Sequence, residues 1–112
     1  LHMFERTATA DTEIGGVSIK EGQKIAALIG SANRDETVFS SPESMDLTRD
    51  PNPHIGFGAG IHFCLGAPLA RLEMSVSLPA LWEKYPAMQL AGEAVRRPTF
   101  VLRGYESVAI SA

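Results

Sequence analysis

A chain of 112 residues with 45% hydrophobic residues has the composition of one folded unit and not of a disordered segment. Its 10 basic and 13 acidic residues give a formal net charge of -3, which offers no electrostatic attraction for nucleic acid or an anionic membrane. The single cysteine excludes an intrachain disulfide, and the longest apolar run, residues 25–29, is too short to cross a bilayer. Composition therefore predicts a cytoplasmic protein without a nucleic-acid or membrane partner.

The N-terminal part of the chain is predicted to form a compact β-meander. Residues 6–14 are rich in threonine and lack helical periodicity, which favours a strand. A turn at Gly15–Gly16 leads into a short alternating strand at residues 17–19, and a second turn leads into a buried strand at residues 24–29. The following residues, 31–50, contain many Asn, Asp, Ser and Pro residues, which predicts an irregular loop with one short helix near Glu36.

The C-terminal part begins with a predicted amphipathic helix. Its apolar residues recur at helical spacing on one face and are Leu65, Leu69, Leu72 and Val76. Pro79 lies inside this pattern and is expected to kink or divide the helix, because proline removes a backbone N–H and clashes with the preceding turn.

Beyond the helix the pattern indicates short strands. Residues 88–90 favour one strand, and residues 93–98 are predicted to be a polar loop. Residues 99–102 and 107–110 then read as the two strands of a C-terminal β-hairpin around a glycine turn.

Residues 57–66, here called the cysteine loop, contain the only cysteine and three of the 10 glycines. Gly58, Gly60 and Gly66 are expected to allow tight backbone turns and a close approach to a ligand or to the thiol. The proline that follows favours the first turn of a helix, so Cys64 should lie just before a helix N-terminus. Backbone N–H groups at such a position stabilise negative charge, which predicts a thiolate at Cys64.

The sequence Phe57-Gly58-Ala59-Gly60-Ile61-His62-Phe63-Cys64-Leu65-Gly66 resembles the haem-ligand loop of the cytochrome P-450 monooxygenases. Residues 32–35, 53–56 and 67–73 also look like soluble bacterial, especially actinobacterial, members of that family. The resemblance implies an α+β fragment of the mainly α cytochrome P-450 fold, with residues 1–112 as its C-terminal haem-thiolate portion. The central oxygen-activating helix and the Glu-x-x-Arg helix of the family would then lie outside this chain.

The resemblance also implies a site. Cys64 would be the axial thiolate ligand of the iron in haem b, while His62 and Arg6 would contact the haem propionates. Phe57 and the three glycines would shape the loop. The implied activity is insertion of one atom of dioxygen into a small organic substrate, with electrons from NAD(P)H through a ferredoxin or flavodoxin-type donor. Arg71 is the candidate docking residue for that donor.

Two further roles follow from the same resemblance. Residues 1–4 would line the substrate side of the haem. Arg49 would correspond to an arginine that bonds to the Glu-x-x-Arg pair in the family. Because no Glu-x-x-Arg pair precedes Arg49 in this sequence, Arg49 is expected to be an ordinary surface arginine.

Three alternatives remain open at this point. His54, His62 and Cys64 could hold zinc, although a structural zinc site requires four ligands. Cys64 could be a nucleophile with His62 as its base, although no third orienting residue is evident. The chain could also be a catalytically inactive module that self-associates through unpaired strand edges and exposed apolar surface.

Overall fold

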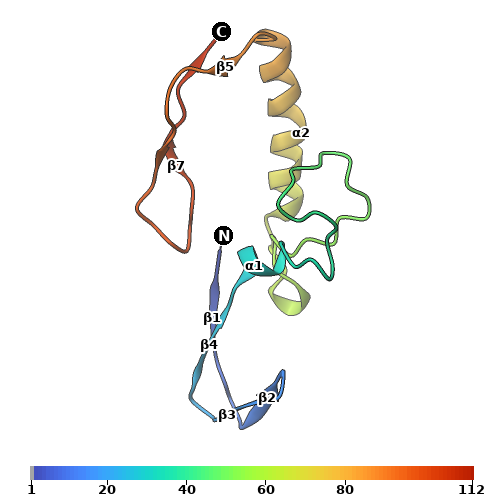
Figure 1. Ribbon diagram of the computed structural model, residues 1–112, viewed down its shortest axis with the longest axis vertical. Helices are drawn as coiled ribbons and strands as arrows, with labels where there is room; N and C mark the ends of the chain where they lie inside the picture. Colours follow the sequence, from blue (N-terminus) through green and yellow to red (C-terminus); the bar gives the residue numbers. More distant parts are fainter. Residues whose placement is uncertain (1) are drawn as a thin grey trace. The chain divides into compact units, whose positions relative to one another are not determined.

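The computed structural model describes residues 2–112, and the chain divides into two compact units, Leu1–Gly56 and Phe57–Ala112. We call them the N-terminal unit and the C-terminal unit. Figure 1 shows strands and one four-residue helix in the first, and one long helix with short strands in the second. The predicted α+β character is therefore confirmed.

Four strands of the N-terminal unit form two antiparallel pairs. They are β1 (Phe4–Thr7), β2 (Thr12–Ile14), β3 (Val17–Ile19) and β4 (Lys24–Ala27). β2 pairs with β3 across the turn at Gly15 and Gly16, whose φ values of 57° and 79° are readily adopted only by glycine. β1 pairs with β4, and β3 does not pair with β4, so the predicted meander of three successive strands is wrong. The strands form a long hairpin with a second pair at its tip.

A side-chain contact joins the two chain segments at the break between the two pairs. The carboxylate of Asp11 accepts hydrogen bonds from Lys20 Nζ at 2.6 Å and from the Glu21 backbone N–H at 3.0 Å. Asp11 thus holds the turn at Lys20 and Glu21 against the segment that precedes β2. The predicted continuous strand over residues 6–14 is wrong, since residues 8–11 between β1 and β2 are not part of a strand.

Two predictions after β4 are also wrong. β4 ends at Ala27, and Ile29 belongs to the short helix α1 (Ile29–Ala32) and not to a buried strand. No helix forms near Glu36. Residues 36–38 form a turn, in which the Asp35 side chain accepts hydrogen bonds from both the backbone and the hydroxyl of Thr37.

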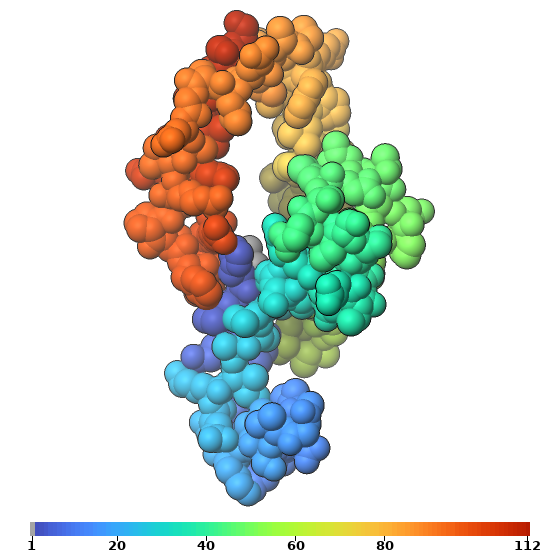
Figure 2. Space-filling view, viewed as in Figure 1, coloured from blue at the N-terminus to red at the C-terminus, as the bar shows by residue number. Residues whose placement is uncertain are grey.

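Residues 33–56 form an irregular loop, where 31–50 was predicted; residues 31 and 32 belong to α1. Asn33 Oδ1 accepts a hydrogen bond from the Ile55 N–H at 2.8 Å and thereby joins the two ends of this segment. The Phe39 side chain lies inside the loop and is only 6% exposed. Figure 2 shows the same segment as a rounded body of green atoms.

The C-terminal unit begins with the cysteine loop, which contains the 3-10 helix η1 (Gly60–His62), and continues into α2 (Ala67–Lys84). Pro68 lies in the first turn of α2, as predicted. The helix runs through Pro79 without a break, so the predicted division is wrong, and a kink there stays a prediction. Proline removes one hydrogen bond from the ladder, and the remaining bonds of this 18-residue helix maintain it on both sides.

Apolar residues lie on two sides of α2, which corrects the prediction of a single apolar face. Leu69, Leu72 and Val76 share one side through spacings of three and four residues. A second set, spaced by four residues, lies on the opposite side and contains Met74, Leu78 and Trp82. All six side chains are exposed in the described part of the chain.

Four short strands follow α2. They are β5 (Gln89–Leu90), β6 (Val95–Arg96), β7 (Tyr105–Ser107) and β8 (Ile110–Ser111). β5 pairs with β8, and β6 pairs with β7, so a C-terminal hairpin exists as predicted. Both of its strands were assigned to the wrong residues. Residues 99–102 form a turn in which Thr99 Oγ1 donates to the Leu102 carbonyl at 2.8 Å, and residues 107–110 contain the break between β7 and β8.

Few side chains are buried in residues 2–112. The buried hydrophobic residues of this part are Ile29, Phe39 and Ala67. Trp82 on α2 is 58% exposed. No helix within these residues is long and apolar enough to cross a membrane.

Candidate functional site

Hydrogen bonds close the cysteine loop on itself. The Cys64 N–H donates to the Phe57 carbonyl at 2.8 Å, and the Phe63 N–H donates to the Gly60 carbonyl at 3.0 Å. The Ala67 N–H at the start of α2 donates to the Cys64 carbonyl at 3.2 Å. The cysteine therefore lies three residues before α2, as predicted, and both of its backbone polar groups are bonded.

Two of the three loop glycines adopt conformations that favour glycine. Gly58 has φ 77° and Gly60 has φ 61°. A Cβ at Gly58 would also lie only 3.1 Å from the His62 carbonyl oxygen. Gly66 has φ -82°, and a Cβ there would meet Cys64 Sγ at an ordinary contact distance of 3.8 Å. The expectation of a special conformation is confirmed for Gly58 and Gly60 and is wrong for Gly66.

The Cys64 thiol is free and exposed. Its sequence neighbours present apolar side chains to the surface: Ile61 and Leu65 are both 98% exposed and Phe63 is 51% exposed. A flat, largely apolar macrocycle could cover such a surface while its iron takes the thiolate as an axial ligand. The residues present therefore fit a haem, although they do not by themselves shield the sulfur from water.

An aromatic and cationic cluster joins the cysteine loop to α2. The rings of Phe57 and Phe63 meet edge to face, with centroids 6.4 Å apart and an interplanar angle of 60°. The guanidinium carbon of Arg71, in the second turn of α2, lies 5.3 Å from the centroid of the Phe57 ring. Sequence reasoning missed this contact, and no local signal in the pattern indicates it.

The two predicted propionate contacts belong to different units. His62 is the last residue of η1 and is exposed. Arg6 lies on β1, where its Nη1 donates to the Glu5 carbonyl at 2.8 Å and its guanidinium carbon lies 5.3 Å from the Phe4 ring centroid. Both roles stay predictions. The predicted substrate-side segment begins at Leu1, which lies outside the described residues.

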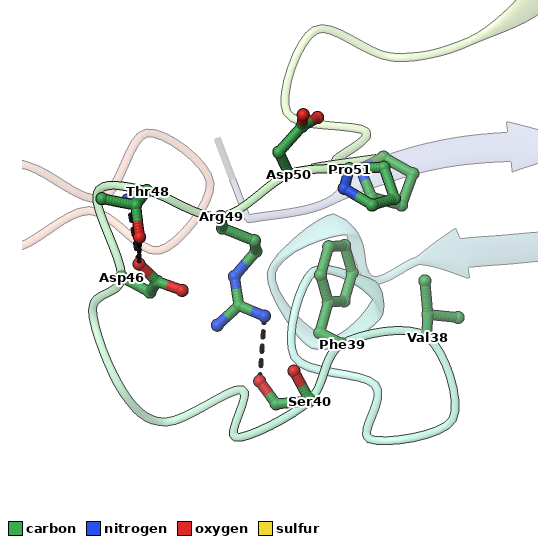
Figure 3. A pocket seen from close by; sticks show the side chains of 9 residues that line it. Val38, Phe39, Ser40, Asp46, Thr48, Arg49, Asp50 and Pro51 are labelled. Carbon is green, nitrogen blue, oxygen red and sulfur yellow. Dashed lines mark hydrogen bonds between the residues drawn. The ribbon is translucent and has the colours of Figure 1, made fainter.

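Arg49 lies at a pocket of about 370 Å³ in the loop of the N-terminal unit (Figure 3). Its Nη1 donates to the Ser40 carbonyl at 2.9 Å, and its guanidinium carbon lies 5.9 Å from the Phe39 ring centroid. Arg49 is thus half-buried and bonded within the loop, so the expectation of an ordinary surface arginine is wrong.

The same pocket contains an aspartate-centred turn. The Thr48 hydroxyl and N–H donate to Asp46 Oδ1 at 2.8 and 2.9 Å (Figure 3). These two hydrogen bonds lower the pKa of Asp46 from its ordinary value of 3.8, and the bond from the hydroxyl has the larger effect. Asp46 therefore keeps its charge under ordinary conditions and holds this part of the loop.

The zinc alternative requires a cluster of ligands. Within residues 2–112, no group of three or more His, Cys, Asp or Glu side chains could hold a metal ion. The proposed set of His54, His62 and Cys64 is therefore not brought together as a site. A haem needs only one axial protein ligand, so this finding does not bear on it.

Fold and site together define a fragment with one exposed cysteine in a hydrogen-bonded glycine loop that leads into a long helix. The cytochrome P450 family model matches residues 2–98. The chain is 55% identical over 87 residues to the cytochrome P450 YjiB of Bacillus subtilis, which covers 78% of this chain and 22% of that protein. It is 48% identical over 105 residues to the steroid C26-monooxygenase of Rhodococcus jostii, covering 93% of this chain and 22% of that protein.

A solved structure gives the same result. CYP164A2 of Mycobacterium smegmatis superposes with a TM-score of 0.96 at 40% sequence identity, over 99% of this chain and 28% of that chain. This chain therefore belongs to the cytochrome P450 family, which implies a haem cofactor. It spans about a quarter of the length of the relatives that it matches.

Proposed function

We propose that this chain is the haem-binding part of a bacterial cytochrome P450 monooxygenase and that Cys64 is the axial thiolate ligand of the iron. One observation carries the proposal. The only cysteine is exposed at the end of a closed glycine loop, and both its N–H and its carbonyl are bonded to backbone. The backbone is thereby held while the sulfur remains accessible, which is the arrangement that an axial ligand needs.

Other residues complete the proposed site. His62 and Arg6 bind the haem propionates, and Phe57, Gly58, Gly60 and Gly66 shape the loop. When bound, the haem supplies the activation of dioxygen, and electron donation by a cysteine thiolate favours cleavage of the O–O bond.

The activity assigned to the whole protein is insertion of one oxygen atom into a small organic substrate. Electrons come from NAD(P)H through a ferredoxin or flavodoxin-type donor, for which Arg71 is the candidate docking residue. The exposed position of Arg71 on α2 supports this candidacy. The R. jostii relative is named for oxidation of a steroid, but the loop and helix described here do not select a substrate class.

The experiment is an absorption spectrum of the protein with added haem, reduced and exposed to carbon monoxide. A red-shifted Soret band is expected for the native protein, and its loss is expected in Cys64→Ala because the thiolate is gone. Met45→Ala is the matched control, since Met45 is 89% exposed and offers the iron another sulfur. A band that survives in Cys64→Ala, or one that disappears in Met45→Ala, would refute the assignment of Cys64.

A further inference from the structure

Arg71 interacts with an aromatic ring and not with a carboxylate. No Asp or Glu in residues 2–112 forms an ion pair with it. Its guanidinium carbon lies 5.3 Å from the centroid of Phe57, within the range in which a cation is attracted to the face of a ring. Because Arg71 stands on the second turn of an 18-residue helix, this contact attaches the beginning of the cysteine loop to a rigid element.

The contact reaches Cys64 by two routes. The Phe57 carbonyl accepts the Cys64 N–H at 2.8 Å, so the backbone position of Phe57 sets one end of that hydrogen bond. The Phe57 ring also meets the ring of Phe63, the residue directly before the cysteine, at 6.4 Å. A displacement of Phe57 would therefore change both the hydrogen bond of Cys64 and the packing of its neighbour.

We infer that Arg71 is a positioning residue for Cys64, acting through the ring and the carbonyl of Phe57. The direction of a metal ligand depends on the groups that hold it, and hydrogen bonds around a cysteine sulfur tune the metal that it binds. Arg71 holds the cysteine loop in the conformation that presents Sγ. The inference rests on the proposed function where haem is concerned, but its structural step can be measured without haem.

The test is amide hydrogen exchange at Cys64 in the haem-free protein. Arg71→Gln is expected to speed exchange of the Cys64 N–H by about two- to five-fold, the equivalent of one exposed cation–π contact. Arg71→Lys keeps the cation and should speed exchange less. Arg96→Gln is the matched control, because it removes the same charge in the same unit. The guanidinium carbon of Arg96 lies 4.8 Å from the centroid of the Tyr105 ring. It should leave the Cys64 rate unchanged.

A double variant separates the contact from the charge. In a Phe57→Leu background the ring is absent, so Arg71→Gln should add no further increase in the exchange rate. An unchanged Cys64 rate in Arg71→Gln would overturn the inference. So would an equal increase in Arg96→Gln, or an additive increase in the double variant.

The haem-loaded protein then distinguishes positioning from docking. Positioning predicts that Arg71→Gln lowers the fraction of protein showing the red-shifted carbon monoxide band, at low and high salt alike. A docking role alone would leave that band unchanged and slow electron transfer in a salt-dependent way, and that result would overturn the inference. Failure of the native protein to bind haem would refute the proposed function, while the exchange rates would still decide the role of Arg71.

Discussion

Replacement of Gly58 by alanine is the perturbation for which the structure gives the largest local effect in the cysteine loop. The φ value of 77° is costly for any residue with a Cβ, by about 1–2 kcal/mol. The new Cβ would also lie 3.1 Å from the His62 carbonyl oxygen, which is backbone and cannot rotate away as a side chain would. The two effects together give about 1–3 kcal/mol in favour of the open loop.

Other glycines provide a graded series. Gly60→Ala meets open space at φ 61°, so only the backbone term of about 1 kcal/mol applies. Gly66→Ala has an ordinary contact distance and a common φ, and its effect should be close to zero. Gly92→Ala, which is outside the loop and meets nothing within 4 Å, is the control.

Amide hydrogen exchange at Cys64 and Phe63 reports directly on the two hydrogen bonds that close the loop. Gly58→Ala should speed exchange at both positions by a factor of about 5–150, Gly60→Ala by less, and the other two variants hardly at all. If Gly58→Ala left both exchange rates unchanged, or if Gly66→Ala raised them equally, the left-handed conformation at Gly58 would not be what closes the loop.

Two further predictions concern the loop pocket and α2. Thr48→Val should raise the pKa of Asp46 toward 3.8 in a carboxyl NMR titration while leaving Asp35 unchanged; an unmoved Asp46 would contradict the hydrogen-bond cause. Because the pKa of Asp46 is lowered in the folded loop, the ionised carboxylate stabilises the fold. This contribution is complete above about pH 3.8 and is lost as the pH falls through the lowered pKa. If the chain is a self-associating module, light scattering should show a molecular mass that rises with protein concentration. This mass should fall in Leu69→Glu or Trp82→Glu, but not in the control Met45→Glu. A monomer at high concentration would refute this prediction.

The sequence was sufficient where the determinants are local. The Gly15–Gly16 turn, the start of α2 at Pro68 and the position of Cys64 each depend on residues within a few positions of one another. For the same reason the irregular loop could be expected from its Asn, Asp and Ser residues, whose side chains bind nearby backbone.

Features that depend on distant residues were missed. Residues 93–98 have the composition of a loop, yet Val95 and Arg96 form a strand because β7 offers its backbone to them. The pairing of β1 with β4 and the contact between Arg71 and Phe57 likewise join segments that no short window contains. Strand propensity is weak beside such pairings, so a pattern within one segment does not decide them.

The helix α2 was predicted to have one apolar face, and it has two. One side, with Leu69, Leu72 and Val76, has the spacing of the apolar stripe of a surface helix, and this side was predicted. The opposite side, with Met74 and Trp82, is equally apolar and equally exposed within residues 2–112. Each apolar side of a helix needs another element to cover it, so α2, with apolar residues on two opposite sides, has the composition of a helix that packs on both. The relatives that this chain matches are about four times as long, and chains of that length have the additional elements to provide such cover.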